Sequence, residues 1–367
     1  MRFALLLSIL LVLLAIVSAF MSWRLENTYP PAGAFIEIEG ERLHYLDIGP
    51  KQTGAPTIVI LHGASANLHD MHVSLGETLA NQYRVILFDR PGRGYSTRPD
   101  DGHDLNVQSR LIHSALQKLE IENPILVGQS FGATVSLAYA LAYQQDLSGL
   151  VLLAGVSHGW PGGVIWYNRV TTIPVIGPIL RRTVVPFYGP VVAKGSVKAA
   201  FWPKPAPENY YENTRLAMLF RPKDFVNNAT DIVHLKSNVL AMADRYEELK
   251  LPVRIFVGTH DTTVSPTIHS YTLSQQIDGA ELTILPDTGH GLHHTASAEI
   301  IAGIESLASE IIVRNTEASY VPPAVNAAVA TDSDADNTEA ESAAQTVDDA
   351  AIEPVETDED DVQNQTP

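Results

Sequence analysis

Short, continuously apolar runs rich in β-branched residues recur along the middle of the chain. They are Thr57–Leu61, Arg84–Phe88, Ile125–Val127, Leu150–Leu153, Val253–Val257 and Glu281–Leu285. Runs of this kind are typical of strands buried on both faces of a mainly parallel sheet. Between the runs, Val107–Leu119 and Ala133–Tyr143 have helical character, and the apolar positions of the first keep to one helical face. The pattern predicts an α/β fold.

Two segments depart from this alternation. Near the start, Phe35–Ile38 and Leu43–Leu46 alternate apolar and polar residues around a short polar turn, which predicts an antiparallel hairpin at the leading edge of the sheet. Residues 157–249 contain no convincing strand and hold nine prolines and many aromatic residues. We expect this segment, called the cap below, to be a mostly helical insertion over one end of a core formed by residues 30–156 and 250–314.

The first 24 residues form a separate unit. Phe3–Phe20 is apolar apart from two serines, and this length suffices to cross the bilayer core. Arg2 precedes it, which favours a signal-anchor whose N-terminus stays in the cytoplasm. A cleavable signal peptide is the alternative, because Val17-Ser18-Ala19 has the small residues of a cleavage site. Both interpretations place the remainder of the chain outside the cytoplasm, as a single-pass membrane protein or as a secreted or periplasmic one.

Charge is concentrated at the other end. The chain carries 24 Lys and Arg against 42 Asp and Glu, and 14 of the acids lie from Asn315 onward, where no Lys or Arg occurs. Residues 315–367 are therefore expected to form an acidic disordered tail. The remainder is nearly neutral, which argues against nucleic acid as a partner. The chain has no cysteine, so disulfides, thiolate metal sites and a cysteine nucleophile are excluded.

A candidate nucleophile lies between a predicted strand and a predicted helix. The segment Gly128-Gln129-Ser130-Phe131-Gly132 has the pattern G-x-S-x-G directly after Ile125–Val127. The glycines permit a sharp turn that projects a serine from the end of a strand, and the helix that follows favours negative charge there. We therefore predict that Ser130 is a nucleophile.

A serine hydroxyl needs a base to become nucleophilic. His290 lies in a loop after the last predicted strand, and Asp261 follows the preceding strand, where it is expected to orient the imidazole. Asp287 is a competing acid, but it is very close to His290 in the sequence. The order Ser130, Asp261, His290 is that of the α/β-hydrolase fold. Upstream, the amides of Ala64 and Phe131 form the expected oxyanion hole.

Four motifs together resemble those of α/β-hydrolase-fold serine hydrolases that carry a cap. They are Leu61-His62-Gly63-Ala64, the run from Phe88 to Ser96, the G-x-S-x-G segment and Gly289-His290. The resemblance covers about residues 35–310. It implies a mostly parallel sheet with an antiparallel N-terminal hairpin and a helical cap insertion. Relatives that use an aspartate nucleophile, such as epoxide hydrolases, do not fit a serine at position 130.

The resemblance implies acyl transfer through an acyl-enzyme, without a cofactor or a metal. The cap is rich in aromatic side chains, which favours a small hydrophobic carboxylic ester as substrate (Trp160, Trp166, Tyr167, Phe187, Tyr188, Trp202, Tyr210, Tyr211, Phe220, Phe225). An amidase or aminopeptidase, a carbon–carbon bond hydrolase and a non-catalytic binding protein remain open alternatives. The sequence does not determine the oligomeric state.

Two further patterns bear on partners. His290, His293 and His294 form an H-x-x-H-H cluster, but the sequence shows no carboxylate that completes a metal site, so none is expected. Ile173–Val185 is apolar and includes Arg181 and Arg182. We expect this stretch of the cap to touch a bilayer surface in an anchored protein.

Overall fold

The structure, a computed structural model, describes residues 1–51 and 54–319. Its centre is an eight-stranded sheet in the order β1-β2-β4-β3-β5-β6-β7-β8. The first two strands run antiparallel to each other and β2 is antiparallel to β4, whereas all later neighbours are parallel. The strands are β1 Ala34–Ile38, β2 Glu41–Ile48, β3 Ile58–Leu61, β4 Val85–Phe88, β5 Ile125–Gln129, β6 Gly149–Leu153, β7 Val253–Gly258 and β8 Glu281–Leu285.

Every predicted strand is present, and the predicted α/β-hydrolase-like sheet with its antiparallel hairpin is confirmed. The central strands are continuously apolar because they serve two cores. In β3, Val59 and Leu61 belong to one core while Ile58 and Ile60 belong to the other. The same alternation holds in β4, β5 and β6. A strand with helices on both faces has no position at which a polar side chain meets water.

One prediction about the strands is wrong. Glu281–Leu285 was expected to be buried on both faces, but β8 pairs with β7 alone at the edge of the sheet, and of its five residues only Leu285 is buried. Edge strands have one neighbour, so the outer positions of β8 reach solvent.

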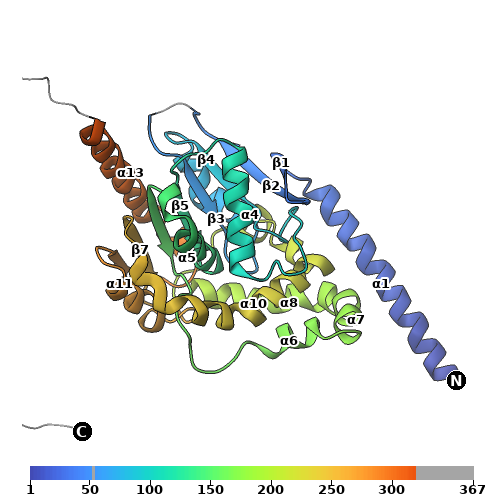
Figure 1. Ribbon diagram of the computed structural model, residues 1–367. Helices are drawn as coiled ribbons and strands as arrows, with labels where there is room; N and C mark the ends of the chain where they lie inside the picture. Colours follow the sequence, from blue (N-terminus) through green and yellow to red (C-terminus); the bar gives the residue numbers. More distant parts are fainter. Residues whose placement is uncertain (52–53, 320–367) are drawn as a thin grey trace, which may run out of the picture. The chain divides into compact units, whose positions relative to one another are not determined.

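Helices cover both faces of the sheet (Figure 1). The first core lies under α4 Leu105–Lys118, α5 Phe131–Tyr143 and α11 Thr272–Gln276, and the second under α13 Ser297–Ser319 and the short helices after β3. The short elements of the core are α2 Leu68–Met71, η1 His72–Gly76, α3 Glu77–Leu79, η2 Gln144–Asp146, η5 Thr267–Tyr271 and α12 Leu292–Thr295. These layers position the loops at the carboxyl ends of the strands.

Only helices connect β6 to β7 in the described chain. They are α6 Trp166–Thr172, α7 Ile176–Thr183, α8 Val185–Phe201, α9 Tyr210–Asn213, η3 Leu216–Phe220, α10 Pro222–Met242 and η4 Ala243–Glu248. Proline lies at the N-terminal turn of α8 and of α10, where its missing N–H costs no hydrogen bond. The segment corresponds to the cap that the sequence analysis expects between residues 157 and 249.

The two ends of the chain differ in how far they are described. Helix α1, Arg2–Thr28, is the helix within the described residues that is long and apolar enough to cross a membrane. At the other end, α13 continues to Ser319, so residues 315–319 are helical and do not belong to a disordered tail. The rest of the predicted tail, residues 320–367, lies outside the described residues.

Candidate active site

The structure brings Ser130, His290 and Asp261 into one hydrogen-bonded chain. The Ser130 Oγ atom lies 3.0 Å from His290 Nε2, and His290 Nδ1 lies 2.7 Å from Asp261 Oδ2. Ser130 follows β5, Asp261 follows β7 and His290 follows β8, so the carboxyl ends of three parallel strands deliver all three side chains to the same end of the sheet. This geometry suits transfer of a proton from a serine hydroxyl to an imidazole.

Ser130 occupies a strained turn between β5 and α5. Its φ of 52° lies in the left-handed region, which a serine rarely adopts. The flanking glycines make the turn possible. A Cβ on Gly132 would lie 2.3 Å from the Leu61 carbonyl oxygen, and one on Gly128 would lie 2.6 Å from the Ala133 amide nitrogen. The helix and strand can therefore approach only because both positions lack a side chain.

Asp261 is held by its own loop. One carboxylate oxygen accepts hydrogen bonds from the amides of Thr263 at 2.9 Å and Val264 at 2.8 Å, and the other faces His290. The Asp261 side chain is fully buried, whereas the His290 ring is 12% exposed. The competing acid, Asp287, makes its described hydrogen bond through its backbone to Thr259, and His290 pairs with Asp261.

The loop after β3 presents the Ala64 amide. The Gly63 carbonyl accepts hydrogen bonds from His62 Nδ1 at 2.8 Å and from Arg90 Nη2 at 3.2 Å. The N–H of the next residue points the opposite way in a planar trans peptide. Ala64 N–H is thus turned away from Arg90, and it meets no acceptor within the described part of the chain. The Phe131 amide begins α5, where the first amides lack helical acceptors.

Arg90 is a residue that the sequence analysis did not single out. Its side chain is fully buried and bonds the His62 carbonyl at 2.8 Å and the Gln108 side chain at 2.9 Å. The Arg90 amide donates to His62 Nε2, so that nitrogen is unprotonated and Nδ1 carries the hydrogen. Burial, aided by Arg90, lowers the pKa of His62 to about 3. His62 is therefore a neutral support of the loop rather than an acid or base.

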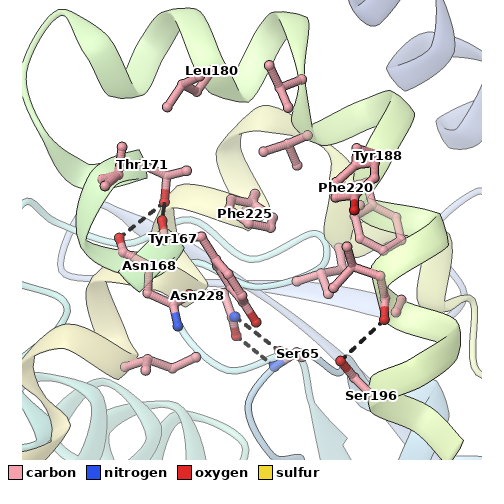
Figure 2. A pocket seen from close by; sticks show the side chains of 18 of the residues that line it. Ser65, Tyr167, Asn168, Thr171, Leu180, Tyr188, Ser196, Phe220, Phe225 and Asn228 are labelled. Atoms are coloured by element: carbon pink, nitrogen blue, oxygen red, sulfur yellow. Dashed lines mark hydrogen bonds between the residues drawn. The ribbon is translucent and has the colours of Figure 1, made fainter. Parts of the chain in front are cut away.

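A cavity of about 330 Å³ lies within the cap above this loop. Figure 2 shows Ser65 and Asn228 at its polar end, where the Ser65 amide donates to Asn228 Oδ1 at 2.6 Å. The remaining wall is almost wholly apolar, and no charged side chain lines it in the described structure. Of the aromatic cap residues expected around the substrate, five line the cavity: Trp166, Tyr167, Tyr188, Phe220 and Phe225.

The other five do not line it, and several of them pack elsewhere. Trp160 lies against the His269 ring, Trp202 against His260, and Tyr210 against Phe201 and His294. These residues fix the cap to the core. The sequence could not distinguish the two sets because both are aromatic and both lie in the same proline-rich segment.

The histidines after His290 meet a carboxylate that the sequence analysis missed. Asp70 in α2 accepts hydrogen bonds from His293 Nε2 and His294 Nε2, each at 2.9 Å. These three side chains form a group that a metal ion would fit, so the statement that no carboxylate completes such a group is wrong. Tyr210 OH also donates to Asp70 at 3.2 Å. Three donors satisfy the carboxylate without an ion, and they join α2, α9 and α12.

Comparison with known proteins agrees with the architecture. A family model described as alpha/beta hydrolase fold matches residues 56–167. A 2-hydroxy-6-oxononadienedioate/2-hydroxy-6-oxononatrienedioate hydrolase of Escherichia coli (strain K12) is 27% identical over 259 residues, which is 68% of this chain and 84% of that protein. An uncharacterized protein of Mycobacterium tuberculosis (strain ATCC 25618 / H37Rv) is 23% identical over 287 residues, or 76% of this chain and 82% of that protein.

Solved structures give the same fold. The enol-lactonase from Burkholderia xenovorans LB400 superposes with a TM-score of 0.61 at 20% identity, covering 75% of this chain and 100% of that one. A thermophilic esterase from Thermogutta terrifontis superposes with a TM-score of 0.61 at 18% identity, covering 76% and 99%. Together with the sheet order and the matched family model, these likenesses show that the chain has the α/β-hydrolase fold.

Proposed function

We propose that the protein is a membrane-anchored serine hydrolase that cleaves carboxylic esters of hydrophobic substrates. The observation that carries this proposal is the hydrogen-bonded chain from Ser130 through His290 to Asp261. The cap also holds an apolar cavity, whose lining includes Ser65, the residue after Ala64, but not the three side chains of that chain. A serine, an imidazole and a buried carboxylate in this order are the parts of an acyl-transfer site.

In the proposed reaction, Ser130 Oγ attacks the ester carbonyl carbon while His290 Nε2 takes the hydroxyl proton. The amides of Ala64 and Phe131 donate hydrogen bonds to the oxyanion of the tetrahedral intermediate. The carbon–oxygen bond to the leaving alcohol then breaks, and His290 returns the proton to that oxygen. Water repeats the sequence on the acyl-enzyme, which releases the carboxylic acid and restores Ser130.

The cavity supports the choice of substrate class. Its walls are built mainly from Val, Leu and aromatic side chains, and the few polar ones are Ser65 and Asn228 at one end together with Asn168, Thr171 and Ser196. Apolar walls with a few oriented polar groups are typical of pockets for hydrophobic small molecules. An acyl chain in the cavity would leave its carbonyl at the polar end, beside the loop that carries Ala64.

A carbon–carbon bond hydrolase is the second candidate, because the Escherichia coli relative has that activity by name. A dienedioate carries two carboxylates, which call for cationic or hydrogen-bonding partners in the pocket. The described cavity is lined by no Lys or Arg. Hydrogen-bonding side chains do line it (Ser65, Asn168, Thr171, Ser196, Asn228), so the ester is favoured over the dienedioate by the missing cations in that lining alone.

Membrane anchoring is the less direct part of the proposal. It rests on α1, which has the length and mean hydropathy of a membrane span, with Arg2 before the apolar run. In this arrangement the catalytic domain lies on the extracytoplasmic side. A secreted form after cleavage near Ala19 is the alternative, and the mass of the mature N-terminus distinguishes the two.

The first test is labelling of the full-length protein in detergent with a fluorophosphonate probe. We expect wild type and the surface variant Ser309→Ala to be labelled, and Ser130→Ala and His290→Ala to lose labelling while staying folded. A separate, unlabelled sample of a protein that reacts with the probe should hydrolyse p-nitrophenyl esters faster than the matching anilides, and prior labelling should abolish this turnover. Absence of labelling in folded wild type would make a non-catalytic binding role the better account, and faster anilide turnover would favour an amidase.

A further inference from the structure

The cap carries a surface that is both apolar and cationic. Of the large apolar side chains that the described residues leave exposed outside α1, most lie between Ile165 and Val192 (Ile165, Trp166, Ile173, Val175, Ile176, Ile179, Val184, Phe187, Tyr188, Val191, Val192). Val175 at the tip between α6 and α7 is 74% exposed. A contiguous patch of this kind on a folded domain marks an interaction site.

Charge in this segment has one sign. From Ile165 to Lys204 the sequence holds six Lys and Arg and no Asp or Glu, although the chain as a whole is acidic. Arg169, Arg182, Lys194 and Lys198 are exposed. Apolar side chains interleaved with long cationic ones are the chemistry that recognises an anionic lipid surface.

This surface continues onto α1. The residues of α1 that are least exposed form a single stripe at helical spacing, which runs Leu11, Leu14, Ala15, Ser18, Met21, Ser22 and Leu25. Its neighbours are α7 and η3, and Figure 1 shows α7 beside the middle of α1. A helix that packs on the apolar segment of a membrane span must itself lie at the level of that membrane.

Polar contacts hold the cap and α1 in this arrangement. Glu26 near the end of α1 pairs with Arg221 at 2.9 Å, and Arg215 donates to the Pro30 carbonyl at 3.0 Å. Arg221 is fully buried, so removal of its partners would be costly. The cap therefore has a defined position beside α1.

The cavity opens on the same surface. Trp166, Val184, Tyr188 and Val192 line the cavity and are each more than a third exposed. Figure 2 shows the cavity between α7, α8 and α10, the first two of which also carry the apolar surface. An opening whose rim is apolar and cationic faces lipid more favourably than water.

We infer that the outer faces of α6, α7 and α8 insert into the headgroup and upper acyl region of an anionic bilayer, and that a hydrophobic ester enters the cavity laterally from that leaflet. The inference rests on the proposed anchoring by α1 and on the proposed esterase site, and it adds the partner and the route of the substrate. Arg182 of α7 is exposed and lies where it can reach lipid phosphates, whereas Arg181 donates to the Thr171 carbonyl at 2.7 Å.

Because the natural sequence has no cysteine, single-cysteine variants of the full chain give a direct test. Val175→Cys and the matched control Val313→Cys on α13, which is 55% exposed, are labelled with an environment-sensitive fluorophore in vesicles of phosphatidylglycerol and phosphatidylcholine. We expect the label at 175 to shift to the blue, to be quenched by nitroxide-bearing lipids and to be protected from an aqueous quencher. The label at 313 should show none of these effects.

Equal exposure of both labels to the aqueous quencher would overturn the inference. This fluorescence readout needs no turnover, so it gives the same result in a Ser130→Ala background. Whether the esterase proposal is wrong is tested separately, by the absence of fluorophosphonate labelling in the wild-type protein. If the mass of the mature chain shows that α1 has been removed, the proposed anchoring by α1 is wrong. In that case blue-shifted emission at 175 on added vesicles would still support the surface, and unshifted emission would refute it.

The route is tested by charge reversal away from the cavity. The double variant Arg182→Glu, Lys194→Glu should hydrolyse a long-chain ester dissolved in vesicles at least about 25-fold more slowly than wild type, because each cation near an anionic surface is worth about 1 kcal/mol, or about fivefold, and two are lost. Its rate on a short, water-soluble ester should not change. The control Lys250→Glu should match wild type on both substrates. Equal loss on both esters, or no loss on either, would contradict entry from the lipid.

Discussion

Each side chain of the candidate site is held in place by a different set of contacts. Ser130 and His290 are 160 positions apart in the sequence, and Ser130 follows the buried strand β5 whereas His290 follows the edge strand β8. Asp261 has two amides on one oxygen and His290 on the other. A carboxylate held in this way fixes the tautomer of the imidazole, with Nδ1 protonated and Nε2 free to accept a proton from Ser130.

We predict that Asp261→Asn lowers kcat for p-nitrophenyl butyrate by about 10⁴-fold, because an amide at this position permits the wrong tautomer. The amide keeps the shape of the side chain, so thermal unfolding should change little. Asp287→Asn is the matched control and should stay within about twofold of wild type. If Asp287→Asn lowered kcat more than Asp261→Asn in a steady-state assay, Asp287 and not Asp261 would be the acid that orients His290.

At the level of elements, the turn from β5 into α5 sets Ser130, the proposed nucleophile, against the loop after β3. A Cβ at position 132 would meet the backbone carbonyls of Leu61 at 2.3 Å and of His62 at 2.6 Å. Backbone atoms of a buried strand end have little freedom to move, so the contact cannot be relieved locally. The same loop carries Ala64, and a displaced loop would disturb the oxyanion site as well.

Gly132→Ala is therefore expected to destabilise the protein by about 1–3 kcal/mol and to reduce fluorophosphonate labelling. Gly195→Ala in α8 is the comparison, because a Cβ there meets nothing within 4 Å and alanine favours a helix. Thermal unfolding in detergent, followed by near-UV circular dichroism, measures both. A Gly132→Ala protein as stable and as reactive as Gly195→Ala would show that α5 is not pressed against the loop.

Across the whole molecule, several histidines are buried in neutral form. Burial lowers the pKa of His62 to about 3 and those of His69 and His269 to about 4. Like-charged neighbours act in the same direction, namely Arg90 for His62, Arg215 for His69 and His158 for His269. In the unfolded chain the same rings titrate near 6.5. The unfolded state therefore binds more protons than the folded state below that pH.

Stability should consequently be fully present above about pH 6.5 and should fall as the pH drops from there towards 4. Each buried histidine contributes up to about 1.4 kcal/mol per pH unit in this window. Unfolding temperatures between pH 7.5 and 4.5 measure the effect. His269→Asn should flatten the slope. A constant unfolding temperature across the range would show that these rings are accessible to protons.

Much of the fold and of the candidate site was predictable from the sequence. The apolar runs fall within one or two residues of β3 to β8, and the three proposed catalytic side chains follow strands that the runs identify. Contacts between distant segments were not predictable. Asp70 meets His293 and His294 across 223 and 224 positions, and Arg90 reaches the carbonyls of His62 and Gly63. Neither pairing leaves a local pattern, because residue spacing reports only on neighbours along one helix or strand.

By itself the sequence determined the α/β-hydrolase fold, the serine at the turn, the order of its partners and an apolar first helix, because each of these is written in local periodicity or in a short motif. The tertiary structure alone decided which aromatic cap residues line the cavity, that Asp70 meets His293 and His294, that β8 is an exposed edge, and that α7 lies against α1. These features depend on which helices and strands contact one another in the folded chain. Whether a side chain in such a contact is buried depends on how the whole elements pack.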